Sequence, residues 1–278
     1  MKRIFLPIIL CGMLFASCGN YTKIMQSADY EYKYEMAKQY YADGHYSRSI
    51  ILLQDIISVL KGTDKGEESL FLLGMSAYKG HDFESAASFF KKYYQTYPKG
   101  TYVKDARFYC GKSLYLCTPE PKLDQTETQG AMTELQNFIE MYPTSQFVDE
   151  AQQLLFKLQD KLIEKEYLSA KMYYDMGTYF GNCSFGGSNY QACILTAQNA
   201  LKDYPYASRR EDLSIMILRA KYGLAHQSVE TKKEERLSST VDEYYGFSSE
   251  YPESKYSEEA KGILEKANKE LKKLTGKK

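Results

Sequence analysis

Apolar residues recur at every third or fourth position along nearly the whole chain after residue 30, and runs that alternate at every second position are scarce. This spacing places apolar side chains on one face of a helix, so it predicts an all-α fold. The stretch from Glu68 to Pro98, ESLFLLGMSAYKGHDFESAASFFKKYYQTYP, contains two such patterns with Gly80-His81 between them. We therefore expect paired helices joined by short turns.

The same stretch has the residue spacing of a tetratricopeptide repeat. The matching positions are Leu73-Gly74, Ala77, Phe83, Ala86, Phe90 and the closing Pro98. Small residues at Gly74 and Ala86 allow two antiparallel helices to approach closely, and the proline ends the second helix because it cannot extend the hydrogen-bond ladder. Each copy of the motif thus predicts one helix pair.

Further copies of the motif cover most of the chain, at residues 30–61, 101–143, 146–205 and 207–252. A final helix is expected at 257–273. We predict a tetratricopeptide-repeat solenoid of about five helix pairs plus a C-terminal capping helix. Three copies exceed the ~34-residue period of the motif. We expect the excess in two loops rich in Pro, Gly, Ser and Asn, at 118–129 and 181–189.

A Tyr-Pro pair occurs four times, at residues 97–98, 142–143, 204–205 and 251–252. Eight residues after each proline stands a small or apolar residue: Ala106, Ala151, Leu213 and Ala260. We interpret each pair as the end of a helix pair, and the later residue as the point where the next helix packs against its predecessor. Tyr97 is expected to pack at such a joint. The repetition therefore predicts architecture rather than a recognition motif.

The first residues predict export and a lipid anchor. Lys2 and Arg3 precede an apolar run of 12 residues, which is too short to span a bilayer core of ~30 Å. Phe15-Ala16-Ser17-Cys18 is similar to a bacterial lipobox, in which the cysteine is diacylated and becomes the mature N-terminus. The alternative is an ordinary signal peptide with a chance cysteine. We predict a signal peptide at 1–17, a lipidated tether at 18–29 and the repeat domain at 30–278.

Composition argues against catalysis and against a nucleic-acid partner. The 36 basic residues balance the 36 acidic ones, and three histidines are too few for most metal sites. His45 and His81 each follow a glycine and are expected in turns. No Ser/His/Asp set, phosphate-binding loop or carboxylate pair stands out. The sequence therefore predicts no enzyme, no cofactor and no metal.

The cysteines after Cys18 include one candidate disulfide. Cys110 and Cys117 are seven residues apart on one predicted helix, which places them ~10 Å apart and beyond disulfide reach, so both are expected in the core. Cys183 and Cys193 flank the second inserted loop, and a bridge between them would close a short ring. The alternative is that Cys193 is simply buried at a close-packing position.

Several features together resemble one family. The lipobox, the repeats, the Tyr-Pro pairs and the segment KLDQTETQGAMTELQNFIEMYPTSQFVDEA at 122–151 are similar to the BamD family, the lipoproteins of the outer-membrane barrel-assembly machine. The resemblance implies a non-catalytic scaffold at the periplasmic face of the outer membrane. Its partners would be the periplasmic domains of BamA and unfolded outer-membrane barrel proteins. The alternatives are another periplasmic tetratricopeptide lipoprotein, for cell-wall synthesis or glycan binding, and an enzyme with its site in the inserted loops.

In a solenoid of this kind, the first helix of each pair lines a groove. The first two units would present there Tyr34, Lys38, Tyr41, Phe71, Met75 and Tyr78. Aromatic, soft and cationic groups suit an extended apolar peptide that ends in an aromatic residue and a carboxylate. The alternative for several of these rings is packing between repeats. The lysine-rich end of the last helix likewise has two interpretations, a solvated face or a contact with a membrane surface.

Overall fold

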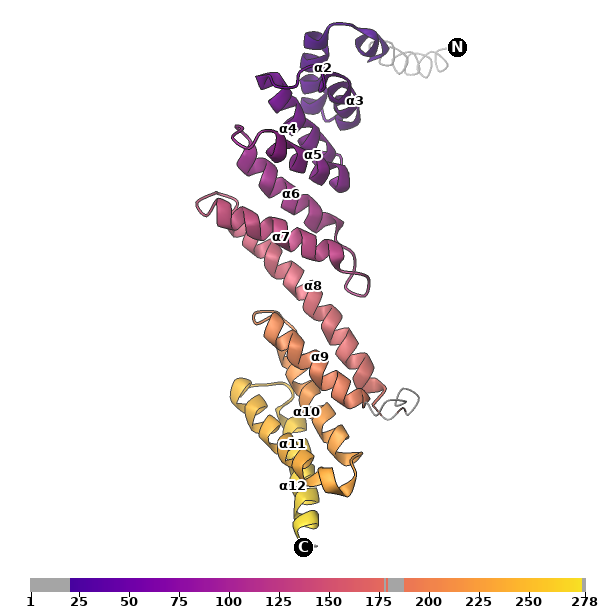
Figure 1. Ribbon diagram of the computed structural model, residues 1–278, viewed down its shortest axis with the longest axis vertical. Helices are drawn as coiled ribbons and strands as arrows, with labels where there is room; N and C mark the ends of the chain where they lie inside the picture. The colour runs from indigo at the N-terminus through magenta and orange to yellow at the C-terminus, as the bar shows by residue number, and fades with distance from the viewer. Residues whose placement is uncertain (1–20, 178, 180–187, 277–278) are drawn as a thin grey trace, which may run out of the picture. The chain divides into compact units, whose positions relative to one another are not determined.

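The computed structural model of the protein describes residues 21–177, 179 and 188–276, and the regular structure in these ranges is entirely helical (Figure 1). The all-α prediction is confirmed. After a helical segment at 21–26, the helices are α2 (Tyr30–Ala42), α3 (Tyr46–Ile56), α4 (Asp64–Lys79), α5 (Phe83–Thr96), α6 (Val103–Cys117), α7 (Thr126–Met141), α8 (Val148–Asp175), α9 (Asn189–Asp203), α10 (Arg210–His226), α11 (Glu230–Glu250) and α12 (Ser257–Thr275).

The contacts among these helices divide the chain into two compact units. Unit 1 contains the described residues up to Thr118 together with Thr126–Leu154, and unit 2 contains Pro119–Gln125 and the chain from Leu155 onward. Consecutive helices pack against each other within each unit, for example α2 with α3, α4 with α5 and α6 with α7 in unit 1, and α9 with α10 and α11 with α12 in unit 2. This consecutive pairing is consistent with the predicted tetratricopeptide-like solenoid.

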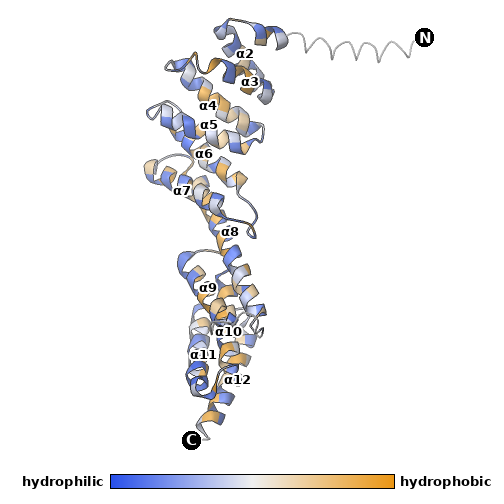
Figure 2. Cartoon of the chain, turned by 45° about the vertical axis from the view of Figure 1, so that its right-hand side comes forward, coloured by the Kyte–Doolittle hydropathy of each residue, from blue (hydrophilic) through white to orange (hydrophobic). Residues whose placement is uncertain are grey.

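Each unit has an apolar core formed by the inward faces of its helices, and Figure 2 shows orange hydrophobic and blue hydrophilic residues along the same helices. The main core of unit 1 includes the fully buried side chains of Leu52, Leu53, Phe90 and Tyr93. In unit 2, Ile163 and Ala170 of α8 pack with Cys193, Leu213 and Ile217 and their neighbours on α9 and α10. Aliphatic and aromatic burial of this kind is the main source of stability in a helical repeat.

The Tyr-Pro pairs end helices with one repeated backbone geometry. Tyr97, Tyr204 and Tyr251 are the C-caps of α5, α9 and α11, with φ between −124° and −128° and ψ of 68° or 69°. The next helix begins five residues after the proline at all four pairs: α6, α8, α10 and α12. The residues eight positions after the prolines are 0% or 1% exposed. The prediction that these pairs are joints is confirmed, and Tyr97 packs against the core of unit 1.

The residue before the first turn of α6, α8 and α10 contacts an aromatic ring on the preceding first helix of a pair. In unit 1, Tyr102 stacks on Phe71 with ring centroids 4.5 Å apart, and Phe147 stacks on Phe108 at 4.4 Å. In unit 2, the residue before α10 is a cation, Arg209, and its guanidinium lies 4.7 Å from the ring centroid of Tyr167 on α8. These contacts fix each first helix against the one before it.

The extra length of the longer repeats lies partly in a loop and partly in helices. The inserted loop is confirmed in the third unit, where residues 118–125 separate α6 from α7, but the prediction is wrong for the fifth unit, which is long because of its helices. α8 has 28 residues and α11 has 21, so the fourth and fifth units are long because their helices are long. The loop expected at 118–129 ends earlier, because α7 begins at Thr126. The second expected loop lies largely outside the described residues. Apolar periodicity identifies a segment as a helix, but it is a weak signal for where that helix ends.

Packing begins inside the segment predicted as a tether. Residues 21–26 are helical, and Ile24 is 3% exposed in the core of unit 1. The predicted signal peptide and Cys18 lie outside the described residues. No helix in the described part of the chain is both long enough and apolar enough to cross a membrane.

Candidate functional site

The first helices of the three pairs of unit 1 lie next to one another and share a register. α2 contacts α4, and α4 contacts α6. Ala37, Gly74 and Gly111 are buried at equivalent positions. A Cβ added at Gly74 would lie 2.5 Å from the Phe90 ring, and one at Gly111 would lie 2.7 Å from Leu135. These small residues set the distance between the two helices of each pair. On α2 and α4, the side chains three positions before, one position after and four positions after the small residue are the ones predicted to line the groove.

The first set of these side chains ties α2 to α4. Tyr34 is 2% exposed, and its hydroxyl donates to Glu68 Oε2 at 2.5 Å. Lys38 Nζ lies 2.9 Å from Glu68 Oε1. Burial and the hydrogen bond to Glu68 raise the pKa of Tyr34 to about 12. Burial opposes ionisation of Glu68, but the hydrogen bonds from Tyr34 and Lys38 outweigh it and lower the pKa of that carboxyl. Tyr34 therefore packs between repeats and leaves Lys38 half-exposed at the surface.

Phe71 also packs between helices. Its ring stacks on Tyr102 and lies 5.8 Å from the ring centroids of both Phe90 and Tyr93. Met75 is half-buried against the same core. For Tyr34 and Phe71 the structure thus agrees with packing between repeats, the alternative that the sequence left open.

Tyr41 and Tyr78 belong to a group of rings that is only half-buried. Tyr78 lies 5.1 Å from Tyr109 between ring centroids. The Tyr41 ring lies 5.8 Å from that of Tyr46 between centroids, and burial, then the charges of Tyr46 and Tyr109, raise the pKa of Tyr41. Lys112 Nζ lies 5.8 Å and 5.9 Å from the centroids of Tyr78 and Tyr109. We call Tyr41, Tyr78, Tyr109 and Lys112 the aromatic face of unit 1.

The cation of the aromatic face is held in place from two sides. Lys112 Nζ lies 2.6 Å from Glu150 Oε1 on the first turn of α8. Burial by itself lowers the pKa of Lys112, but the hydrogen bond to Glu150 and the hydroxyl of Tyr78 outweigh it, so the pKa is raised. The ammonium therefore stays charged beside the rings of Tyr78, Phe108 and Tyr109, where a cation gains from their electron-rich faces.

Sequence reasoning missed Tyr109 and Lys112. Gly111 stands in the third unit where Gly74 stands in the second, so Lys112 is the counterpart of Met75, and extending the alignment by one unit would have found it. Tyr109 has the register of Leu72, which was not predicted to face the groove. Only the packing of α6 beside α4 brings its ring to Tyr78.

The other candidate chemistry of the chain has structural roles. Cys110 is 1% exposed, its thiol donates to the carbonyl of Ala87 at 3.5 Å, and burial raises its pKa to about 12. Cys117 is half-buried at the end of α6. Cys193 is buried, while Cys183 lies outside the described residues, so their disulfide stays a prediction.

His45 and His81 lie in turns, as predicted. Gly44 has φ of 78° and His81 has φ of 63°. Among the described residues, no three His, Cys, Asp or Glu side chains group in a way that could hold a metal ion.

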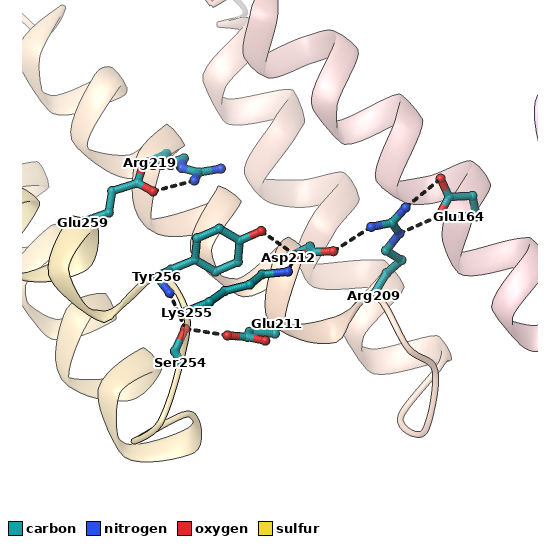
Figure 3. Close-up of polar contacts among 9 residues, drawn as sticks. All are labelled: Glu164, Arg209, Glu211, Asp212, Arg219, Ser254, Lys255, Tyr256 and Glu259. Atoms are coloured by element: carbon teal, nitrogen blue, oxygen red, sulfur yellow. Dashed lines mark hydrogen bonds and ion pairs between the residues drawn. The ribbon is translucent and has the colours of Figure 1, made fainter.

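Unit 2 contains a polar network centred on Asp212, which Figure 3 shows. Asp212 Oδ2 accepts from Arg209 Nη1 at 2.8 Å, and its Oδ1 accepts from the Tyr256 hydroxyl at 2.6 Å and lies 3.0 Å from Lys255 Nζ. Arg209 also pairs with Glu164 of α8 at 2.6 Å. The network connects α8, α10 and the start of α12.

Comparison with models of protein families assigns the chain to a family. A family model described as YfiO, outer membrane lipoprotein, matches residues 26–232, which is well over half of the 278 residues. This chain belongs to the YfiO family of outer membrane lipoproteins, the BamD family. No curated protein matches the chain. The matched range of the YfiO model contains the aromatic face and all of α10, whereas α12 lies beyond it.

Proposed function

We propose that this YfiO-family protein is a lipid-anchored assembly factor of the outer membrane. In this role it binds the periplasmic domains of BamA and receives unfolded outer-membrane barrel proteins for insertion. Family membership supports the role, and stacked helix pairs provide the extended surface that a scaffold needs. Acylation at Cys18 would hold the protein at the periplasmic face without a spanning helix, since two or more acyl chains suffice for a stable anchor.

The aromatic face is the observation that favours peptide binding. Its three tyrosines are half-buried, and Lys112 lies beside two of them, Tyr78 and Tyr109. Tyrosine rings give apolar contact area at a small cost in side-chain entropy. An ammonium attracts a carboxylate. Together they suit an extended apolar segment that ends in an aromatic side chain, whose free carboxylate would share Lys112 with Glu150. Lys38, on the same helix as Tyr41, is a second cation and is paired with Glu68.

The direct test is the double substitution Tyr41→Ala, Tyr78→Ala, with binding of the C-terminal peptide of a barrel protein as the measurement. Truncation of a buried interface tyrosine commonly costs more than ~1 kcal/mol, so we expect affinity to fall at least about tenfold. Tyr206→Ala is the matched control, because Tyr206 is 80% exposed in unit 2. Unchanged affinity in the double variant would exclude the aromatic face as the peptide site.

A second experiment tests the partner. Affinity purification of the protein in mild detergent, followed by identification of the co-purified proteins, should recover BamA, and depletion of the protein should lower the amounts of outer-membrane barrel proteins. Recovery of cell-wall synthesis enzymes without BamA would favour a scaffold of a different pathway. The peptide test and the partner test are separate, since the aromatic face can fail while BamA is still recovered.

A further inference from the structure

The last helix has one face that packs and one that does not. On the packed face, Ala260 and Ile263 join the core with Ile215 and Leu218 of α10. Farther along, Ala267 and Leu271 pack with residues of α10 and α11. These contacts hold α12 in one orientation over nearly its whole length. The opposite face is therefore presented to solvent in a fixed way.

That opposite face is dominated by lysine. Its five lysines are all exposed: Lys261, Lys266, Lys269, Lys272 and Lys273. At 100° per residue they fall within an arc of about 140°. Glu265 lies in the same arc and Glu258 precedes it on the first turn. The sequence continues with Lys277 and Lys278, which lie outside the described residues.

The lysine face has few carboxylates near it within the part of the chain that the structure describes: Glu258 and Glu265 share its arc, and Lys266 acts electrostatically on Glu259. None of the five lysines forms an ion pair there. Elsewhere in unit 2 the pattern is different, since Lys221 pairs with Glu243 at 2.6 Å and Lys233 pairs with Glu270 at 3.2 Å. The lysine face is thus a concentrated positive patch on a rigid helix.

We propose that the lysine face binds the surface of anionic phospholipid headgroups. A helix with four to eight clustered lysines or arginines is typical of proteins that bind such surfaces. Ammonium groups are compact point charges that complement phosphate. The face carries no aromatic or large aliphatic side chain, so the contact would be superficial and sensitive to salt. A lipid surface is favoured over an acidic protein because the family is one of membrane-anchored lipoproteins, which keeps phosphate headgroups near the chain.

The test uses the mature chain with Cys18→Ser, since an acyl anchor would itself hold the protein to vesicles. Co-sedimentation is measured with phosphatidylcholine vesicles and with vesicles that also contain phosphatidylglycerol. We expect binding only to the anionic vesicles at low salt and release at high salt. The variant Lys266→Gln, Lys269→Gln, Lys272→Gln should bind at least about tenfold more weakly, because each lysine near an anionic surface contributes roughly fivefold.

The matched control is Lys91→Gln, Lys92→Gln, Lys99→Gln, which removes the same charge from exposed positions in unit 1. It should bind the anionic vesicles like the parent chain. Equal loss in the two variants, or equal binding to neutral vesicles, would overturn the proposal. So would displacement from vesicles by inorganic phosphate at an ionic strength where sodium chloride leaves the protein bound, or tighter binding to an acidic peptide than to vesicles. Peptide binding at the aromatic face should be the same in both variants. Failure of the lipid proposal can therefore be distinguished from failure of the proposed function.

Discussion

At the scale of single residues, small side chains decide how closely the helices of each pair approach. Gly74 faces the ring of Phe90, and Gly111 faces Leu135, with no room for a Cβ at either position. Gly130, by contrast, has no atom within 4 Å of the position that a Cβ would occupy. The same residue type therefore has opposite consequences for stability at these positions.

Replacing Gly74 or Gly111 with alanine should destabilise unit 1. Overpacking of a filled core costs about 1–3 kcal/mol, and the better helix propensity of alanine offsets up to about 1 kcal/mol of it. Gly130→Ala is the control and should stabilise by about 0.5–1 kcal/mol. Chemical denaturation of the three variants measures these differences. A stabilising Gly74→Ala would show that α4 and α5 can separate without loss.

Asp212 is the carboxylate at the centre of the polar network of unit 2. It is 8% exposed, and burial by itself would raise its pKa, but hydrogen bonds from Tyr256, Arg209 and Lys255 lower the pKa to about 2. A carboxyl whose pKa is lower in the folded than in the unfolded state stabilises the fold when it is ionised. That stabilisation is complete above about pH 4 and is lost as pH falls toward about 2.

Asp212→Asn should therefore cost about 2 kcal/mol of unfolding free energy at neutral pH, and the difference from the parent should shrink on acidification from about pH 4 to about pH 2. Urea denaturation at a series of pH values measures both effects. Asp203→Asn serves as the control because Asp203 is exposed at the end of α9. A difference that stays constant down to pH 2 would mean that ionisation of Asp212 does not support the fold.

At the scale of elements, the joint between α5 and α6 depends on a buried hydroxyl. Tyr93 is fully buried, its hydroxyl donates to Glu67 Oε1 at 2.6 Å, and it accepts from the backbone N–H of Tyr102 at 2.9 Å. Glu67 Oε1 also accepts from the backbone N–H of Thr101 at 2.6 Å. Three helices are thus connected at one point: α4 through Glu67, α5 through Tyr93 and the start of α6.

Tyr93→Phe keeps the ring but removes this connection. Loss of one partner from a buried hydrogen-bonded set costs about 1–3 kcal/mol, so we expect the unfolding free energy to fall by that amount. Thermal and chemical denaturation measure it. Tyr245→Phe, at a position that is 60% exposed, should have no effect. Equal stability of the two variants would show that water replaces the lost hydroxyl at the joint.

At the scale of the whole molecule, different parts of the chain carry different surfaces. Half-buried tyrosines with a neighbouring lysine lie on the first helices of unit 1, and a face on which lysines outnumber carboxylates lies on the last helix of unit 2. The first suits a peptide and the second suits a charged surface. The predicted acyl group at Cys18 adds a third, covalent means of attachment.

Cys18→Ala should release the protein from the membrane. With an ordinary cleavable signal peptide in place of residues 1–17, so that no uncleaved apolar run remains, loss of the acyl chains should move most of the protein into the soluble fraction at high salt. Cell fractionation with quantification of the protein measures this. Mass spectrometry of the parent chain should find diacylated Cys18 as the mature N-terminus. Retention of the unacylated variant in the membrane at high salt would contradict the lipid anchor.

The sequence by itself determined the helices, their order and their joints. These signals are local: apolar periodicity over a few turns, a proline that cannot extend a helix, and a small residue eight positions later that allows close packing. The backbone angles at Tyr97, Tyr204 and Tyr251 agree within a few degrees because the same short sequence meets the same local constraints each time.

Only the tertiary structure decided which side chains form a surface. Tyr34 and Tyr41 stand on one helix, yet Tyr34 is buried by Glu68, which is 34 residues away, while Tyr41 stays half-exposed. Tyr109 joins the aromatic face because α6 packs beside α4. Exposure and charge at such positions depend on partners distant in sequence, and periodicity within one helix contains no information about those partners.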